Sequence, residues 1–141
     1  MNIMLNPGQT NTRKGEINLP ASVNLTGCEN LLWKIVNNNG VANFALPTSV
    51  NDIAPFIGAS GDVIGANTSA EAPSMNENAR ILLDGTCNPG DKLALSSTNY
   101  GRVYAPASGA GSLLVEFIAE EAGVAGQTVL VRRIPARLVT F

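Results

Sequence analysis

Short apolar runs separated by turn-forming residues are the main pattern along this chain. Leu31–Val36 is an apolar run, Asn37-Asn38-Asn39-Gly40 is a turn, and Val41–Leu46 continues the run until Pro47 ends it. The Asn-Gly pair favours the positive backbone φ that tight hairpins need. The pattern therefore predicts a β-hairpin over residues 31–46.

A second series of strand and turn signals covers residues 88–135. A turn at Asn88-Pro89-Gly90-Asp91 precedes Lys92–Leu95, and a second turn at Thr98-Asn99-Tyr100-Gly101 precedes Arg102–Ala105. The run Ala125–Arg133 then reads as a further strand. Another strand is expected at Ala79–Leu83, and an edge strand at Glu16–Leu25 because Pro20 interrupts it.

These two series resemble each other at an offset of about sixty residues. Each has a strand, a glycine turn, a second strand, a long loop with an apolar pair and a closing strand, which is Ala79–Leu83 in one series and Thr128–Arg133 in the other. The match suggests a duplicated β motif, about 28–84 and 88–135. The expected fold class is mainly β: a small β-sandwich or β-barrel-like domain of β-tulip type, with long loops.

The segment Ser112–Gly123 fits two interpretations. Leu113, Leu114, Phe117 and Ile118 would share one face of an amphipathic helix that stops at Gly123. The same residues also fit a strand of about seven residues that is buried on both faces. The repeat favours the strand, because it places a sheet element there.

Residues 1–16 read as an extended N-terminal arm, followed by a single β-rich domain over 17–141. The arm has many turn formers and no periodic apolar face. It is either a frayed terminus or a strap that orders against a partner. Its candidate partner contacts are the apolar tip Ile3, Met4 and Leu5 and the basic pair Arg13 and Lys14.

Composition lowers the expectation of catalysis and of nucleic-acid binding. The 141 residues contain no histidine, which is the commonest general base and metal ligand. Charged residues make up 14%, with a net charge of −2, whereas a nucleic-acid binder needs a basic surface. No metal or cofactor is expected, and neither a secretory signal nor a membrane-spanning segment is recognised. Cys28 and Cys87 have no metal-ligand spacing and are expected to be free thiols, unless an oxidising compartment pairs them.

Two other features are candidate sites. Gly58, Gly61 and Gly65 match no phosphate-binding fingerprint and are expected to form ordinary turns. Glu116, Glu120 and Glu121 form the densest acidic cluster, which is expected to be a solvated rim because no calcium-loop series is present.

Arg132 and Arg133 are candidate partner contacts near the end of the last strand. Because consecutive strand residues face opposite ways, one arginine must share a face with apolar neighbours. Either both reach water at a frayed strand end, or one forms a salt bridge with Glu116, Glu120 or Asp91, within the chain or across a subunit boundary. Phe141, in the apolar C-terminal tail, is expected to dock on the body or on a neighbour.

The segments Pro89–Leu95, Gly101-Arg102-Val103, Leu114–Ala119 and Gly126–Val131 resemble, in this order, motifs of the capsid decoration (cement) proteins of tailed bacteriophages. The resemblance covers about 85–135, and the Leu31 hairpin is similar to the family's first half. Long asparagine-rich loops and the Arg13-Lys14 arm depart from the family pattern.

The resemblance implies a structural virion protein, made in the host cytoplasm, that binds the outside of the expanded capsid. Its partner would be the major capsid protein, and its assembly a homotrimer, with no nucleic acid and no membrane involved. The alternative function is a fibre, spike or adhesion module that binds a glycan or receptor. A small hydrolase ranks third, because no carboxylate pair stands out.

Overall fold

A computed structural model describes residues 15–141 of the chain. Every regular element in that range is a strand, which confirms the mainly β class. The ten strands are, in chain order, β1 (Glu16–Pro20), β2 (Leu32–Asn38), β3 (Val41–Ala45), β4 (Phe56–Ser60), β5 (Asn67–Glu71), β6 (Asn78–Leu82), β7 (Lys92–Leu95), β8 (Val103–Tyr104), β9 (Ser112–Ala119) and β10 (Thr128–Thr140). No helix long and apolar enough to cross a membrane occurs between residues 15 and 141.

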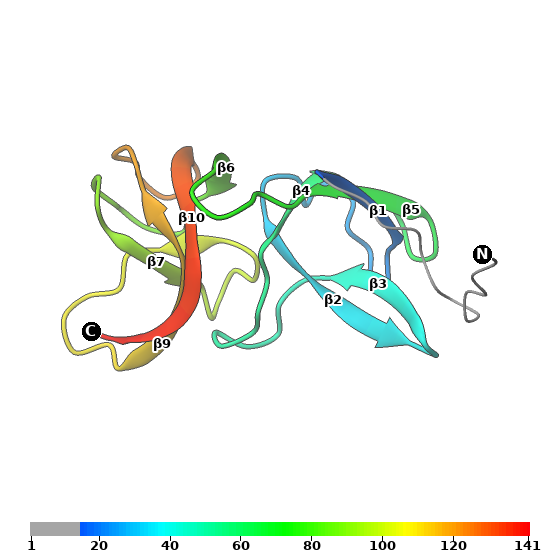
Figure 1. Cartoon of the computed structure of the whole chain (residues 1–141), viewed down its shortest axis with the longest axis horizontal. Coiled ribbons are helices and arrows are strands. Elements are labelled where there is room, and N and C mark those ends of the chain that lie inside the picture. Colours follow the sequence, from blue (N-terminus) through cyan, green and yellow to red (C-terminus); the bar gives the residue numbers. More distant parts are fainter. Residues whose placement is uncertain (1–14) are drawn as a thin grey trace, which may run out of the picture.

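The strands form two antiparallel sheets with the same topology. The first has the order β1-β5-β4-β2-β3 and the second the order β6-β10-β9-β7-β8, so each strand of the first sheet has its counterpart five strands later. The register agrees as well: Trp33 pairs with Phe56, and Leu93 pairs with Phe117 at the equivalent place. Figure 1 shows the two sheets side by side along the long axis of the molecule.

Each sheet curls until its two edge strands meet. A parallel bridge joins Ala21, just after β1, to Phe44 in β3, and an equivalent bridge joins Leu83, just after β6, to Val103 in β8. The two units are therefore called the N-terminal barrel (β1–β5) and the C-terminal barrel (β6–β10). Their curvature confirms the barrel-like form of the expected fold.

The offset between equivalent strands is close to sixty residues, since β2 begins at Leu32 and β7 at Lys92. The sequence comparison predicts that β6 and β10 are equivalent closing strands of the two series. In the structure β6 (Asn78–Leu82) is instead the counterpart of β1, and it lies beside β10 in the same sheet. Both segments read as apolar strands, and sequence alone does not reveal that they are neighbours in one sheet. The internal duplication and the single-domain assignment stay predictions.

Most predicted strands are present. β2 and β3 form the expected hairpin, with Lys34 opposite Ala45. The segment that fitted either helix or strand is β9, which lies between β10 and β7 in the centre of its sheet. Val115 and Phe117 on one face of β9 are buried, and Leu114 and Ile118 on the other are half-buried. Both faces are therefore at least partly covered, which fits the nearly continuous apolar sequence. β1 lies next to only β5 in its sheet, as expected for an edge strand, but it ends at Pro20 instead of reaching Leu25.

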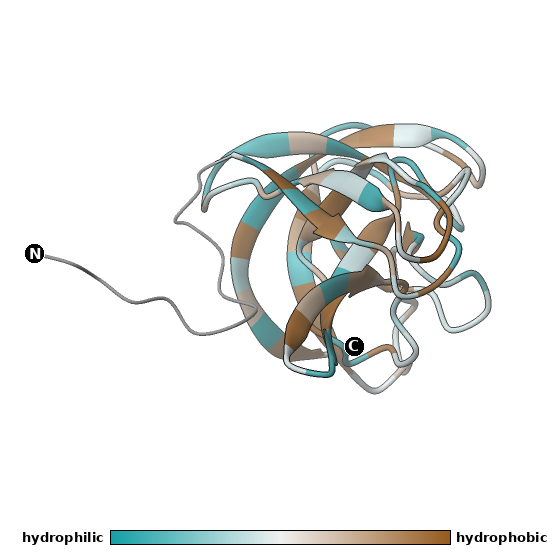
Figure 2. Ribbon diagram, turned by 90° about the vertical axis from the view of Figure 1, so that its right-hand side faces the viewer, coloured by the Kyte–Doolittle hydropathy of each residue, from teal (hydrophilic) through white to brown (hydrophobic). Residues whose placement is uncertain are grey.

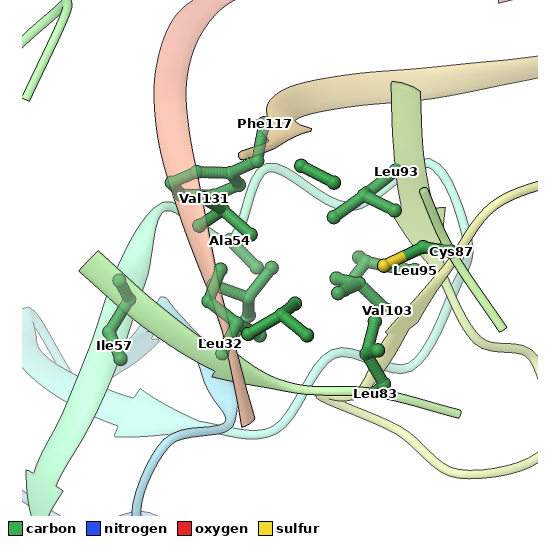
Figure 3. Close-up of a cluster of buried hydrophobic side chains, with 13 residues drawn as sticks. Leu32, Ala54, Ile57, Leu83, Cys87, Leu93, Leu95, Val103, Phe117 and Val131 are labelled. Carbon is green, nitrogen blue, oxygen red and sulfur yellow. The ribbon is translucent and has the colours of Figure 1, made fainter. Parts of the chain in front are cut away.

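Each barrel has its own apolar core. Trp33 and Phe44 lie with tilted rings 5.4 Å apart in the N-terminal barrel. The core of the C-terminal barrel also takes in Leu32, Ala54 and Ile57 from the N-terminal barrel, and Figure 3 shows these three beside the C-terminal side chains. The two barrels therefore share apolar packing where they meet.

Backbone hydrogen bonds join the barrels at the same junction. The Leu32 N–H donates to the Gly101 carbonyl at 2.8 Å, and the Leu82 N–H donates to the Asn30 carbonyl at 3.0 Å. Gly101 has φ +89°, and a Cβ there would lie 2.9 Å from the Leu31 Cβ. Only glycine satisfies both the backbone conformation and the close approach.

Both cysteines are free thiols, as expected. Cys87 is buried and Cys28 is half-buried, and they do not form a disulfide with each other. Burial raises the pKa of both thiols above the ordinary value, which disfavours the reactive thiolate.

Candidate binding surfaces

The arm residues proposed as contacts, Ile3, Met4, Leu5, Arg13 and Lys14, lie outside the described residues. Their roles stay predictions.

Arg132 forms an ion pair within the chain. Its Nε lies 2.8 Å from Oε1 of Glu120, and its guanidinium also donates to the Asn76 carbonyl. The salt-bridge interpretation with Glu120 is therefore correct. Both side chains keep partial contact with solvent, with 42% and 29% of their surfaces exposed.

Arg133 faces the opposite way and shares its side of β10 with the buried Val129 and Val131. Its guanidinium carbon lies 5.9 Å from the centre of the Phe117 ring, and Nη1 donates to the Pro73 carbonyl at 3.1 Å. The frayed-end interpretation is wrong for both arginines. β10 continues to Thr140, with an irregularity after Arg133 that accommodates the following proline.

Phe141 docks on its own chain. Its N–H donates to the Gly111 carbonyl at 2.9 Å, and its half-buried ring helps line a hollow with Lys92 and Pro106. This position agrees with docking on the body. In contrast, Leu138 on the same tail is 65% exposed.

The acidic cluster divides into two kinds of side chain. Glu120 and Glu121 lie on the rim, as expected, and Glu121 pairs with Arg80 at 2.7 Å. The Leu130 N–H and Arg80 lower the pKa of Glu121. Glu116 departs from the expectation because only 5% of it is exposed.

A β-bulge explains the burial of Glu116. Leu93 pairs with Phe117 and the next residue, Ala94, pairs with Val115, so Glu116 is the extra residue of β9. A bulge redirects a side chain from its normal alternation. Glu116 Oε2 accepts the Ala54 N–H at 3.2 Å, while Oε1 is buried without a hydrogen-bond partner. Burial raises the pKa of Glu116, and the Ala54 N–H and the Arg133 charge oppose that shift only in part.

Neither a metal cluster nor a phosphate loop is found in the described part of the chain. No three histidine, cysteine, aspartate or glutamate side chains gather there closely enough to hold a metal ion. Gly58 and Gly61 serve close packing: a Cβ on Gly58 would lie 2.4 Å from the Trp33 ring, and one on Gly61 would lie 1.7 Å from the Leu25 carbonyl oxygen.

Several aliphatic side chains of the N-terminal barrel are exposed. Ile53, Val63 and Ile64, in the loops before and after β4, are 66%, 55% and 68% exposed. Val23, Ile35 and Val41 are also exposed, though less fully.

Two loops of the N-terminal barrel are bound together by their backbones. The Leu25 N–H donates to the Asp62 carbonyl, and the Gly65 N–H donates to the Ala21 carbonyl, both at 2.9 Å. Val23 and the Val63-Ile64 pair therefore sit on neighbouring, mutually fixed loops.

The β2–β3 hairpin adjoins these loops. The Ser22 N–H donates to the Phe44 carbonyl at 2.9 Å, and Phe44 pairs with Ile35 across the hairpin. Ile35 and Val41 line a shallow hollow on the hairpin. Figure 2 looks at the molecule from the side of this barrel and shows brown apolar segments alternating with teal polar ones along its strands.

Comparison with known proteins identifies a fold relative but no family. No family model and no curated protein matches the sequence. The chain is similar to the crystal structure of the head fiber gp8.5 N base of bacteriophage phi29, with a TM-score of 0.66 and 15% identity. The similarity covers 88% of this chain and 97% of that chain, so it extends over both barrels. At this identity the likeness shows the fold alone.

Proposed function

We propose that this chain is a structural virion protein of a tailed bacteriophage. It binds the outer surface of the expanded capsid and stabilises the lattice of major capsid protein. The observation that supports this proposal most directly is the likeness of both barrels to the base of a phage head fibre. The decoration-protein motifs in residues 85–135 point to the same part of the virion.

The proposed role depends on binding, with no reacting group. A protein that binds the assembled shell but not its separated subunits stabilises the shell by mass action. Many copies on one particle would add avidity. The described carboxylates that stand out serve structural roles in keeping with this proposal, since Glu120 and Glu121 pair with arginines and Glu116 holds a backbone amide.

The fold relative also favours a second candidate, the base of a head fibre. In that role the chain would attach to the head and carry an extension that binds a glycan or receptor. The share of the fibre base that is matched, 97%, is the specific reason to retain this candidate.

Binding of the purified chain to emptied, expanded capsids tests the proposed function. Co-sedimentation with the capsids, together with a raised temperature of capsid disruption, is the expected result. Co-sedimentation without any gain in capsid stability would favour the fibre base. If the protein stays in the supernatant and labels a glycan array instead, the adhesion alternative replaces the capsid proposal.

The proposed strap role of the arm has its own test. Deleting residues 1–16 should leave circular dichroism and thermal unfolding close to the intact chain but weaken capsid attachment. Equal attachment of the shortened and intact proteins would contradict the strap. A solution mass of three chains would support the proposed homotrimer.

A further inference from the structure

We infer that Glu116 and Arg133 hold one buried water molecule between them at the junction of the two barrels. Within residues 15–141, two buried side-chain atoms have no hydrogen-bond partner in the protein, and these are Glu116 Oε1 and Arg133 Nε. The first is an acceptor and the second carries a donor hydrogen. Buried polar groups that find no protein partner are commonly satisfied by an internal water, which needs at least two such groups around it.

The two side chains lie close to each other. Arg133 in β10 pairs with Phe117 in β9, which is the residue after Glu116, and its guanidinium carbon lies 5.9 Å from the centre of the Phe117 ring. Burial raises the pKa of Glu116, and the charge of Arg133 opposes that shift, so the guanidinium is near enough to act on the carboxylate. Glu116 also reaches Ala54, which belongs to the same buried cluster as Phe117 (Figure 3).

A water fits between these groups because they do not meet directly. Neither a hydrogen bond nor an ion pair joins Glu116 to Arg133 in the described part of the chain. One water can accept from the Nε–H and donate to Oε1, and two such bonds span a gap of about 4.5–5.5 Å. Charged groups are costly to bury unless they are hydrogen-bonded, and a single water satisfies both of these.

The water completes a buried polar chain that connects both barrels to the segment between them. At one end the Ala54 N–H of the N-terminal barrel donates to Glu116 Oε2 at 3.2 Å. At the other end Arg133 Nη1 donates at 3.1 Å to the carbonyl of Pro73, in the segment 72–77 that joins β5 to β6. The water links these two halves. The site therefore helps to set the position of one barrel against the other.

A crystal structure of the full chain, at a resolution that shows ordered solvent, tests the site directly. The expected result is one water within about 2.6–3.2 Å of both Glu116 Oε1 and Arg133 Nε. A structure with no solvent at this place, or with the two side chains in direct contact, would overturn the inference. A side chain from residues 1–14 bonded to either atom would overturn it as well.

A double-mutant cycle in urea tests the same link in solution. Glu116→Ala and Arg133→Ala each remove one end of the bridge and leave the other end buried. Their combined effect on the unfolding equilibrium constant should therefore be smaller than the product of the two single effects, by at least about threefold.

Glu116→Ala combined with Arg132→Ala is the matched control. Arg132 lies on the opposite face of β10 and pairs with Glu120, so these two effects should multiply. Absence of coupling between Glu116 and Arg133, or equal coupling in the control cycle, would contradict the bridge. Circular dichroism confirms that each variant is folded, and the crystal structure of the wild type decides the question if one of them unfolds.

Discussion

The Ala54 amide and the Glu116 carboxylate form a hydrogen bond of 3.2 Å between the two barrels. Ala54 lies in the loop before β4, and Glu116 is the bulged residue of β9. Both residues are buried, with Ala54 fully enclosed. A buried amide without an acceptor is costly, so this carboxylate helps to fix how the two barrels sit against each other.

Glu116→Ala and Glu116→Gln should have different effects on stability. Alanine leaves the Ala54 N–H without its acceptor, which should lower the free energy of unfolding by about 1–3 kcal/mol. Glutamine keeps an oxygen for that N–H and removes a buried charge whose desolvation is the main cause of the raised pKa. Its stability at neutral pH should equal or exceed that of the wild type, as measured by urea unfolding. Equal losses in the two variants would show that the charge itself is required.

The raised pKa of Glu116 also predicts a specific pH dependence. The unfolded chain releases this proton near the ordinary value of 4.5, while the folded chain retains it to higher pH. The contribution of Glu116 to stability is therefore fully present below 4.5 and is lost as pH rises through the folded pKa. Asp84 and Glu121 have lowered pKa values, so their contributions to stability change with pH in the opposite direction. Subtracting the stability–pH profile of Glu116→Gln from that of the wild type therefore isolates the contribution of Glu116. A pH-independent difference between the two profiles would contradict the prediction.

Local patterns in the sequence predict the strands well because each one depends on near neighbours. The Asn39-Gly40 hairpin and the turn before Gly101 follow from backbone preferences that operate over a few residues. The strand choice for Ser112–Ala119 depended on the repeat, and the structure confirms it. Strand-like segments do not specify their partners, which is why β6 was matched with β10 instead of paired with it.

The sites depend on tertiary contacts and were less predictable. Glu116 is a charged residue of the kind expected at a solvent-exposed rim. Only a bulge, which the register of β7 against β9 creates, turns its side chain inward. Val63 and Ile64 look like core anchors, yet their loop is fixed by backbone bonds that leave both side chains in solvent. The last strand was predicted to end at Arg133 but continues to Thr140, because Pro135 falls in an irregular stretch of β10 where its missing N–H is tolerated.

The two C-terminal arginines should differ in their effect on stability. Arg132→Ala removes a partly exposed ion pair with Glu120 and should cost no more than about 1 kcal/mol. Arg133→Ala removes the cation beside Phe117 and the donor to the Pro73 carbonyl. It also exposes apolar surface that the arginine stem covers, so it should lower the free energy of unfolding by more than Arg132→Ala does. Thermal unfolding of both variants at the same pH checks the order. A larger loss for Arg132→Ala would mean that the ion pair outweighs the packing.

Gly101→Ala should destabilise the chain more than Gly40→Ala, although both glycines occupy hairpin turns. The two have nearly equal φ angles, +89° and +83°, so alanine pays a similar backbone cost at each. A Cβ on Gly40 meets open space, whereas one on Gly101 would lie 2.9 Å from the Leu31 Cβ and 3.1 Å from the Leu32 carbonyl oxygen. Overpacking of this kind adds about 1–3 kcal/mol. Urea unfolding of the two variants measures the difference. Equal losses of stability would show that the residues at the junction shift to make room for the added Cβ at position 101 without further destabilisation.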